Sequence, residues 1–200
     1  MTPGLRYFPG FLALEAQRQL VETLREAVAE APLVTPVMPR TARPFTVRMT
    51  NLGPLGWVSD RAGYRYQATH PVTGRPFPPI PEQLISIWRG VSGYPHDPQA
   101  CLVNFYGGGA KMGLHRDGDE EDFSAPVLSV SLGDTAIFRM GGPERGGKTE
   151  TLKLASGDVL VMGGQSRLCY HGIDRVLTGT STLLKDGGRI NLTLRRVTIP

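Results

Sequence analysis

The sequence is poor in cysteine and has no long apolar run. Its 200 residues include two cysteines, Cys101 and Cys169, too few for the disulfide framework of a small secreted protein. No window of about 18 apolar residues occurs, so no membrane-spanning helix is expected. The first residues also lack the apolar stretch of a secretion signal. We therefore expect a cytoplasmic protein with reduced thiols and no membrane contact.

Acidic residues are almost missing from one segment. Between residues 40 and 75, the sequence has six arginines and one acidic residue, Asp60. This segment is a candidate surface for a polyanion such as a nucleic acid. On charge alone, a solvated basic surface is the simpler interpretation. The arginines are Arg40, Arg43, Arg48, Arg61, Arg65 and Arg75.

Glycine and proline are abundant, with 25 and 17 residues, and favour many turns and short strands. Apolar residues at helical spacing predict helices over 13–31 and from Pro81 to Gly93. Residues 32–56 are expected to form a long connection or short edge strands. The later segments predict a sandwich or barrel of jelly-roll type. Its expected strands are 100–106, 126–132, 135–140, 149–154, 158–162, 166–171 and 188–198.

Histidine is also scarce, and two of the four histidines suggest a metal site. His115 and Asp117 are two residues apart, so on an extended backbone both side chains project to one side. His171 lies more than fifty residues later and must come from another strand. Two imidazoles and one carboxylate form the ligand set of non-haem Fe(II) oxygenases. The alternative is a surface histidine beside the acidic loop 119–122.

The last expected strand carries two arginines on one face. Arg189, Asn191, Thr193 and Arg195 alternate with apolar residues. Two buried arginines would need an anion between them, and a dicarboxylate supplies two carboxylates. A solvent-facing strand is the alternative. On strand 100–106, Asn104 and Tyr106 also share a face and could bind the same dicarboxylate.

Aromatic residues alternate with arginines near residue 60. Trp57, Tyr64 and Tyr66 lie within the basic segment, and the two tyrosines share strand parity. Rings that stack on bases and guanidinium groups that hold phosphates are typical of single-stranded nucleic-acid binding. Packing of these rings inside a small domain is the alternative.

Several motifs stand in a fixed order from about residue 45 to the end. Upstream they are Met49–Gly53, Leu55–Trp57 and Gly63–Tyr66. Downstream they are Asn104–Tyr106, Gly109–Glu120, Ser129–Gly133, Gly157–Val159, Gly163–Gly172 and Arg189–Arg195. The chain thereby resembles bacterial AlkB-type nucleic-acid dealkylases, a family of Fe(II)/2-oxoglutarate dioxygenases. The number and order of the motifs make the resemblance specific.

The resemblance implies an α+β, mostly β fold. Its core would be a double-stranded β-helix (jelly-roll) over 99–200. Residues 1–98 would supply N-terminal helices and a nucleotide-recognition lid, and both parts would form one compact unit, expected to be a monomer.

The resemblance also implies roles for individual residues. His115, Asp117 and His171 would bind Fe(II). Arg189 and Arg195 would hold the carboxylates of 2-oxoglutarate, which reacts together with O2. The remaining implied contacts are Asn104, Tyr106 and Asn191 to 2-oxoglutarate, and Trp57, Tyr64, Tyr66, Asp119 and Arg145 to the substrate.

The implied reaction is oxidative demethylation of 1-methyladenine and 3-methylcytosine, in repair of alkylation damage. It would release formaldehyde, succinate and CO2. Single-stranded or damaged double-stranded DNA is the expected substrate, with RNA as a further candidate. A hydroxylase of a protein or small molecule is one alternative, and a non-enzymatic jelly-roll binding module is the other. Met162 and Cys169 replace aromatic residues of the family, which bears on the shape of the pocket.

Overall fold

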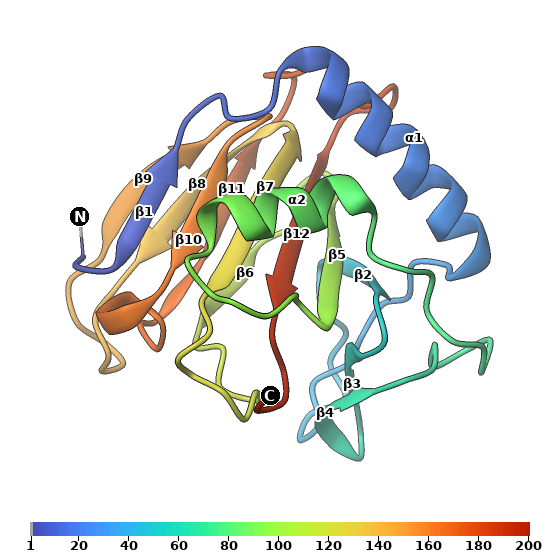
Figure 1. Cartoon of the computed structure of the whole chain (residues 1–200), viewed down its shortest axis with the longest axis horizontal. Helices are drawn as coiled ribbons and strands as arrows, with labels where there is room; N and C mark the ends of the chain where they lie inside the picture. The colour runs from blue at the N-terminus through green and yellow to red at the C-terminus, as the bar shows by residue number, and fades with distance from the viewer. Residues whose placement is uncertain (1) are drawn as a thin grey trace.

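A computed structural model describes residues 2–200, and the chain is mostly β (Figure 1). The α+β, mostly β class expected from the sequence is confirmed. Both expected helices are present, as α1 (Leu14–Glu30) and α2 (Glu82–Val91). The strands are β1 (Leu5–Phe8), β2 (Arg48–Leu52), β3 (Gly56–Asp60), β4 (Gly63–Gln67), β5 (Ala100–Tyr106), β6 (Met112–His115), β7 (Val127–Gly133), β8 (Thr135–Met140), β9 (Glu150–Leu154), β10 (Val159–Met162), β11 (His171–Leu177) and β12 (Arg189–Arg195).

Two antiparallel sheets form the jelly-roll core. The larger has the strand order β1-β10-β7-β12-β5-β2, and the smaller has the order β6-β11-β8-β9. Neighbours in the larger sheet are distant in sequence, because β12 lies between β5 and β7. Apolar side chains from both sheets, including Val127, Phe138 and Ile173, share one buried cluster. The sheets therefore pack face to face.

The helices cover the outer face of the larger sheet (Figure 1). Leu20 and Leu24 of α1 and Trp88 of α2 join a second buried cluster with Val103 of β5 and Leu192 of β12. The helical apolar spacing thus supplies the layer that this face needs. Trp88 is fully buried and its indole N–H donates to the carbonyl of His96.

Residues 32–56 contain one edge strand, as the sequence suggested. Its strand, β2, pairs with β5 and forms the edge of the larger sheet. After it, β3 and β4 form a separate two-stranded hairpin. No helix in the described part of the chain is long and apolar enough to cross a membrane.

The prediction of a strand over 166–171 is wrong. The segment begins with a 3-10 turn, Gly164–Ser166, and the strand β11 starts only at His171. The backbone N–H of Arg167 donates to Gly164, and that of Cys169 donates to Ser166. Gly164 has a φ of 52°, which favours glycine, so its backbone conformation starts a turn in place of a strand.

Candidate active site

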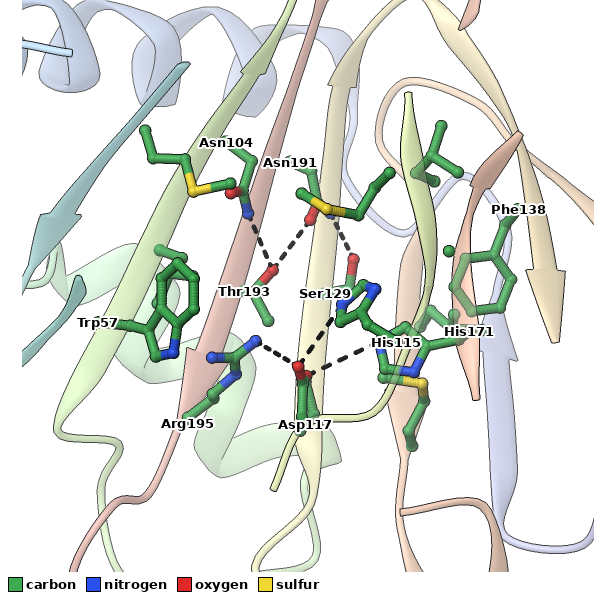
Figure 2. A pocket seen from close by; sticks show the side chains of 18 of the residues that line it. Trp57, Asn104, His115, Asp117, Ser129, Phe138, His171, Asn191, Thr193 and Arg195 are labelled. Carbon is green, nitrogen blue, oxygen red and sulfur yellow. Dashed lines mark hydrogen bonds and ion pairs between the residues drawn. The ribbon is translucent and has the colours of Figure 1, made fainter. Parts of the chain in front are cut away.

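His115, Asp117 and His171 meet at one end of the cavity between the sheets (Figure 2). Because β6 and β11 pair with His171 opposite His115, the ring centroids lie 4.5 Å apart. The Nε2 atoms of His115 and His171 lie 3.7 Å and 3.8 Å from the carboxylate of Asp117. One donor atom from each residue lies within 4.8 Å of the other two. The structure brings together all three expected metal ligands.

Backbone carbonyls orient both imidazole rings. Nδ1 of His115 lies 2.9 Å from the carbonyl of Gly113, and Nδ1 of His171 lies 3.0 Å from that of Cys169. A proton on each Nδ1 satisfies these carbonyls and leaves the Nε2 lone pairs facing Asp117. This arrangement suits metal coordination.

The charges of the site also suit a cation. Burial lowers the pKa of His171 to about 4, so its ring is neutral and able to coordinate. Burial alone would raise the pKa of Asp117, but electrostatic interactions, of which that with Arg195 is the largest, outweigh burial and hold this pKa well below its usual range. Among the described residues, Oδ2 of Asp117 has no hydrogen-bond donor. A buried, ionised and unpaired oxygen beside two imidazoles fits Fe(II).

Arg189 and Arg195 line the same cavity of about 310 Å³, although they lie at opposite ends of β12. Arg189 is fully buried and donates to the hydroxyl of Ser131 at 2.9 Å and to the carbonyl of Leu154 at 3.2 Å. Within residues 2–200 its Nε has no acceptor, and none of the ion pairs includes it. Burial lowers the pKa of Arg189 to about 10, so it remains charged at neutral pH. It therefore presents a buried cation without an anion.

Arg195 differs from Arg189, since its charge already has partners. It lies 2.8 Å from Oδ1 of Asp117 and 3.5 Å from Oε1 of Glu120. The expectation of two unpaired arginines on β12 is thus wrong for Arg195, because its position at the strand end places it beside the acidic segment. Its Nε still lacks an acceptor among the described residues.

The amide and phenol side chains expected on β5 and β12 also form one wall of the cavity. Asn104, Tyr106 and Asn191 line the cavity, and Thr193 connects the two asparagines by hydrogen bonds of 3.5 Å and 2.9 Å (Figure 2). Burial raises the pKa of Tyr106 to about 12, so its hydroxyl keeps its proton. With the cation of Arg189, this wall is suited to a carboxylate.

The β3–β4 hairpin covers the cavity with two of its three aromatic residues. Trp57 and Tyr64 line the cavity and stack with centroids 5.4 Å apart and planes 19° apart. The indole N–H of Trp57 donates to Asp119 at 2.8 Å. Tyr66 does not line the cavity; its hydroxyl contacts Glu120 and Arg195. Trp57 and Tyr64 thus place a pair of stacked rings at the cavity, whereas the hydroxyl of Tyr66 belongs to a polar network with Glu120 and Arg195.

Four other residues from the sequence analysis occupy different positions. Asp119 and Met162 line the cavity, so Met162 contributes directly to the shape of the pocket. Cys169 is buried outside the lining, with its thiol on the carbonyl of Gln165. Arg145 also lies outside the lining, with its guanidinium 5.9 Å from the ring of Tyr170.

Sequence reasoning missed Glu120 and Arg167. Glu120 lies in the acidic loop 119–122, yet its side chain is fully buried and ion-pairs with Arg167 at 3.0 Å. Arg167 also donates to the carbonyls of Asp117 and Ala125. No local pattern marks this pair, since 47 residues separate them.

Comparison with known proteins agrees with this geometry. Residues 4–195 match the family model of the 2OG-Fe(II) oxygenase superfamily. An AlkB homolog of Caulobacter vibrioides, an alpha-ketoglutarate-dependent dioxygenase, is 51% identical over 98% of this chain and 89% of its own length. A DNA N(6)-methyladenine demethylase of Arabidopsis thaliana, ALKBH1C, is 43% identical over 50% of this chain and 24% of its own. The solved structure of OsALKBH1 superposes with a TM-score of 0.81 and 32% identity, covering 98% of this chain and 99% of that one. The chain therefore belongs to the AlkB family of Fe(II)- and 2-oxoglutarate-dependent dioxygenases.

Proposed function

We propose that this dioxygenase demethylates N-alkylated bases in nucleic acid, with 1-methyladenine and 3-methylcytosine as substrates. One observation carries the proposal: a single cavity joins the His115–Asp117–His171 site to a rim formed by Trp57 and Tyr64. When bound, Fe(II) and 2-oxoglutarate supply the oxidation of the N-methyl group by O2, which yields formaldehyde, succinate, CO2 and the unmodified base.

The rim suits a flat, cationic base. Both methylated bases carry positive charge at neutral pH and an exocyclic amine. The indole of Trp57 offers a face for stacking and for attraction to a cation. Asp119, now bonded to the indole N–H, offers a carboxylate that can accept from the amine. Asp119 lines the cavity and is exposed to solvent, which supports its assignment as the acceptor for the exocyclic amine.

The inner residues have separate tasks in this proposal. His115, Asp117 and His171 hold Fe(II). Arg189, with Asn104, Tyr106 and Asn191 on the same wall, binds one carboxylate of 2-oxoglutarate. Arg195, whose Nε is free of protein acceptors in the described chain, binds the other. Neutral His171 and ionised Asp117 supply metal ligands without further proton loss.

A nucleic-acid substrate must present the methylated base outside the double helix. Extrusion is easiest where pairing is already broken, so single-stranded or damaged double-stranded DNA is the proposed partner, and RNA is a further one. Arg145, beside Tyr170 and outside the lining, would contact the strand and not the base. We place the enzyme in the cytoplasm, which the two free, buried cysteines support. We further propose that it is a monomer that forms one compact unit.

The test is release of formaldehyde from a 3-methylcytosine oligonucleotide with Fe(II), 2-oxoglutarate and air. The folded, iron-loaded protein should release it, while the unmethylated oligonucleotide and the variant His171→Ala should give none. Absence of release by iron-loaded protein would overturn the proposal. Succinate formed with a peptide or metabolite substrate would then indicate a hydroxylase.

A further inference from the structure

The β3–β4 hairpin reaches past the cavity into a buried ionic network. The carboxylate of Glu120 is 0% exposed and lies between two guanidinium groups, those of Arg167 and Arg195. The hydroxyl of Tyr66, from β4, donates to Glu120 and accepts from Arg195 at 3.0 Å. A residue of the hairpin therefore takes part in holding Arg195.

The three nitrogens of Arg195 have different surroundings. One terminal nitrogen, Nη2, faces Asp117 at 2.8 Å. The other, Nη1, lies 3.0 Å from Tyr66 and 3.5 Å from Glu120, so Tyr66 is the nearer partner. Nε is buried and lacks an acceptor among the described residues. Contacts at both ends of the planar guanidinium fix its orientation, and with it the direction of the remaining N–H.

We propose that Tyr66 and Glu120 are positioning residues for Arg195, which make the affinity for 2-oxoglutarate depend on the hairpin that covers the substrate cavity. The negative charge of Glu120 balances the positive charge of Arg195. Arg167 donates both to the carboxylate of Glu120 and to the backbone carbonyl of Asp117, and so holds Glu120 in place. Tyr66 fixes the site geometrically, because its hydroxyl lies between Glu120 and Arg195. The inference rests on the proposed function, which places 2-oxoglutarate against Arg195.

A loss of the Tyr66 hydroxyl has a defined consequence. Nη1 of Arg195 would keep only the longer contact to Glu120, and the guanidinium could rotate about its contact with Asp117. The ring of Tyr66 would remain, so the hairpin would still pack. A purely structural role for Tyr66 would instead lower thermal stability and leave the binding of 2-oxoglutarate unchanged.

The experiment compares Tyr66→Phe with Tyr94→Phe. Tyr94 is a matched control, because its hydroxyl also donates to a carboxylate of the acidic segment, Asp122, outside the cavity. Calorimetric titration of Fe(II)-loaded protein with 2-oxoglutarate, without O2 or nucleic acid, measures the dissociation constant. Tyr66→Phe should raise it about tenfold, as loss of a hydrogen bond to a charged group would, and Tyr94→Phe should leave it within about twofold. Equal constants for Tyr66→Phe and the unaltered protein would overturn the proposal.

A second variant, Glu120→Gln, tests the network without depending on Tyr66 alone. It keeps the shape of the side chain and removes its charge. If both residues act through Arg195, Tyr66→Phe combined with Glu120→Gln should weaken 2-oxoglutarate binding by less than the product of the single effects. Independent, multiplicative effects would contradict the inference. Since these titrations contain no nucleic acid, they can succeed even if formaldehyde release, and with it the proposed function, fails.

Discussion

Asp117 connects the metal site to Arg195 through its two oxygens. Oδ1 faces Arg195 at 2.8 Å, while Oδ2 is buried and lacks a donor in the described chain. The same carboxylate therefore orients a cation of the protein and offers a ligand to a metal. Both interactions depend on the negative charge of Asp117.

The variant Asp117→Asn separates charge from size. We expect Fe(II) affinity to fall by about 100-fold or more, because even residues that only support metal ligands change affinity by about 10- to 100-fold. Anaerobic titration with Fe(II) measures the effect. The exposed neighbour Glu121, changed to Gln, should bind iron as the unaltered protein does. Unchanged iron binding by Asp117→Asn would remove Asp117 from the ligand set.

Single residues also show how far sequence reasoning reaches. His115, Asp117 and His171 could be predicted, because metal ligands are chemically distinctive and β-strand parity placed two of them together. Arg195 was found, but its ion pairs with Asp117 and Glu120 were not, since they depend on where the loop after β6 folds. Long-range contacts of this kind leave no periodic pattern in the sequence.

At the scale of elements, the pairing of β6 with β11 sets the spacing of the two histidines. Gly172, next to His171, allows a close approach: a Cβ there would lie 2.5 Å from the carbonyl oxygen of Met112 and 2.8 Å from that of Gly113. Both atoms are backbone, so they cannot rotate away. The absence of a side chain at residue 172 is thus a condition for the distance between the rings.

We predict that Gly172→Ala separates β6 from β11. The free energy of unfolding should fall by about 1–3 kcal/mol, as in overpacked interiors, and Fe(II) affinity should fall with it. Chemical denaturation and metal titration measure the two effects. Gly113→Ala is the matched control on β6, since a Cβ there meets nothing within 4 Å. Equal stability and iron binding for both variants would show that the strands can move apart without cost.

The elements themselves were predictable to different degrees. Both helices followed from apolar spacing and most core strands from turns and alternation. The segment 166–171 looked like a strand because of its apolar run from Leu168 to Tyr170, but the turn that starts at Gly164 continues through it as far as Cys169. Which strands become neighbours could not be predicted, since β12 pairs with β5 and β7 across long stretches of chain.

At the scale of the whole molecule, the first strand closes one edge of the larger sheet. β1 pairs with β10, and Tyr7 donates from its hydroxyl to Asp158 at 2.7 Å. Asp158 also accepts from the backbone N–H groups of Gly10 and Ala155, both at 2.8 Å. One carboxylate therefore joins the beginning of the chain to the turn before β10.

Tyr7→Phe should lower the free energy of unfolding by about 1 kcal/mol at neutral pH, through loss of this hydrogen bond. Burial, with the bond to Asp158 and its charge, raises the pKa of Tyr7 to about 12. The unfolded chain loses this proton near pH 10 and the folded chain near 12, so the contribution is complete below about pH 10 and is lost as the pH rises to about 12. The difference in stability between the two proteins should shrink over that range in denaturant titrations. A constant difference would show that Tyr7 titrates normally.

Side chains of β12 point alternately to the two faces of the larger sheet, so this strand contributes both to the core under the helices and to the cavity. Leu192 and Leu194 pack beneath the helices, while Arg189 and Arg195 face the cavity. With hydrogen-bonded neighbours on both sides, the strand cannot shift to accommodate a change in length. Removal of a single residue from its middle would turn half of the strand over, directing a guanidinium toward the helices and a leucine toward the metal. An insertion or deletion in β12 would therefore disrupt the core and the cavity together.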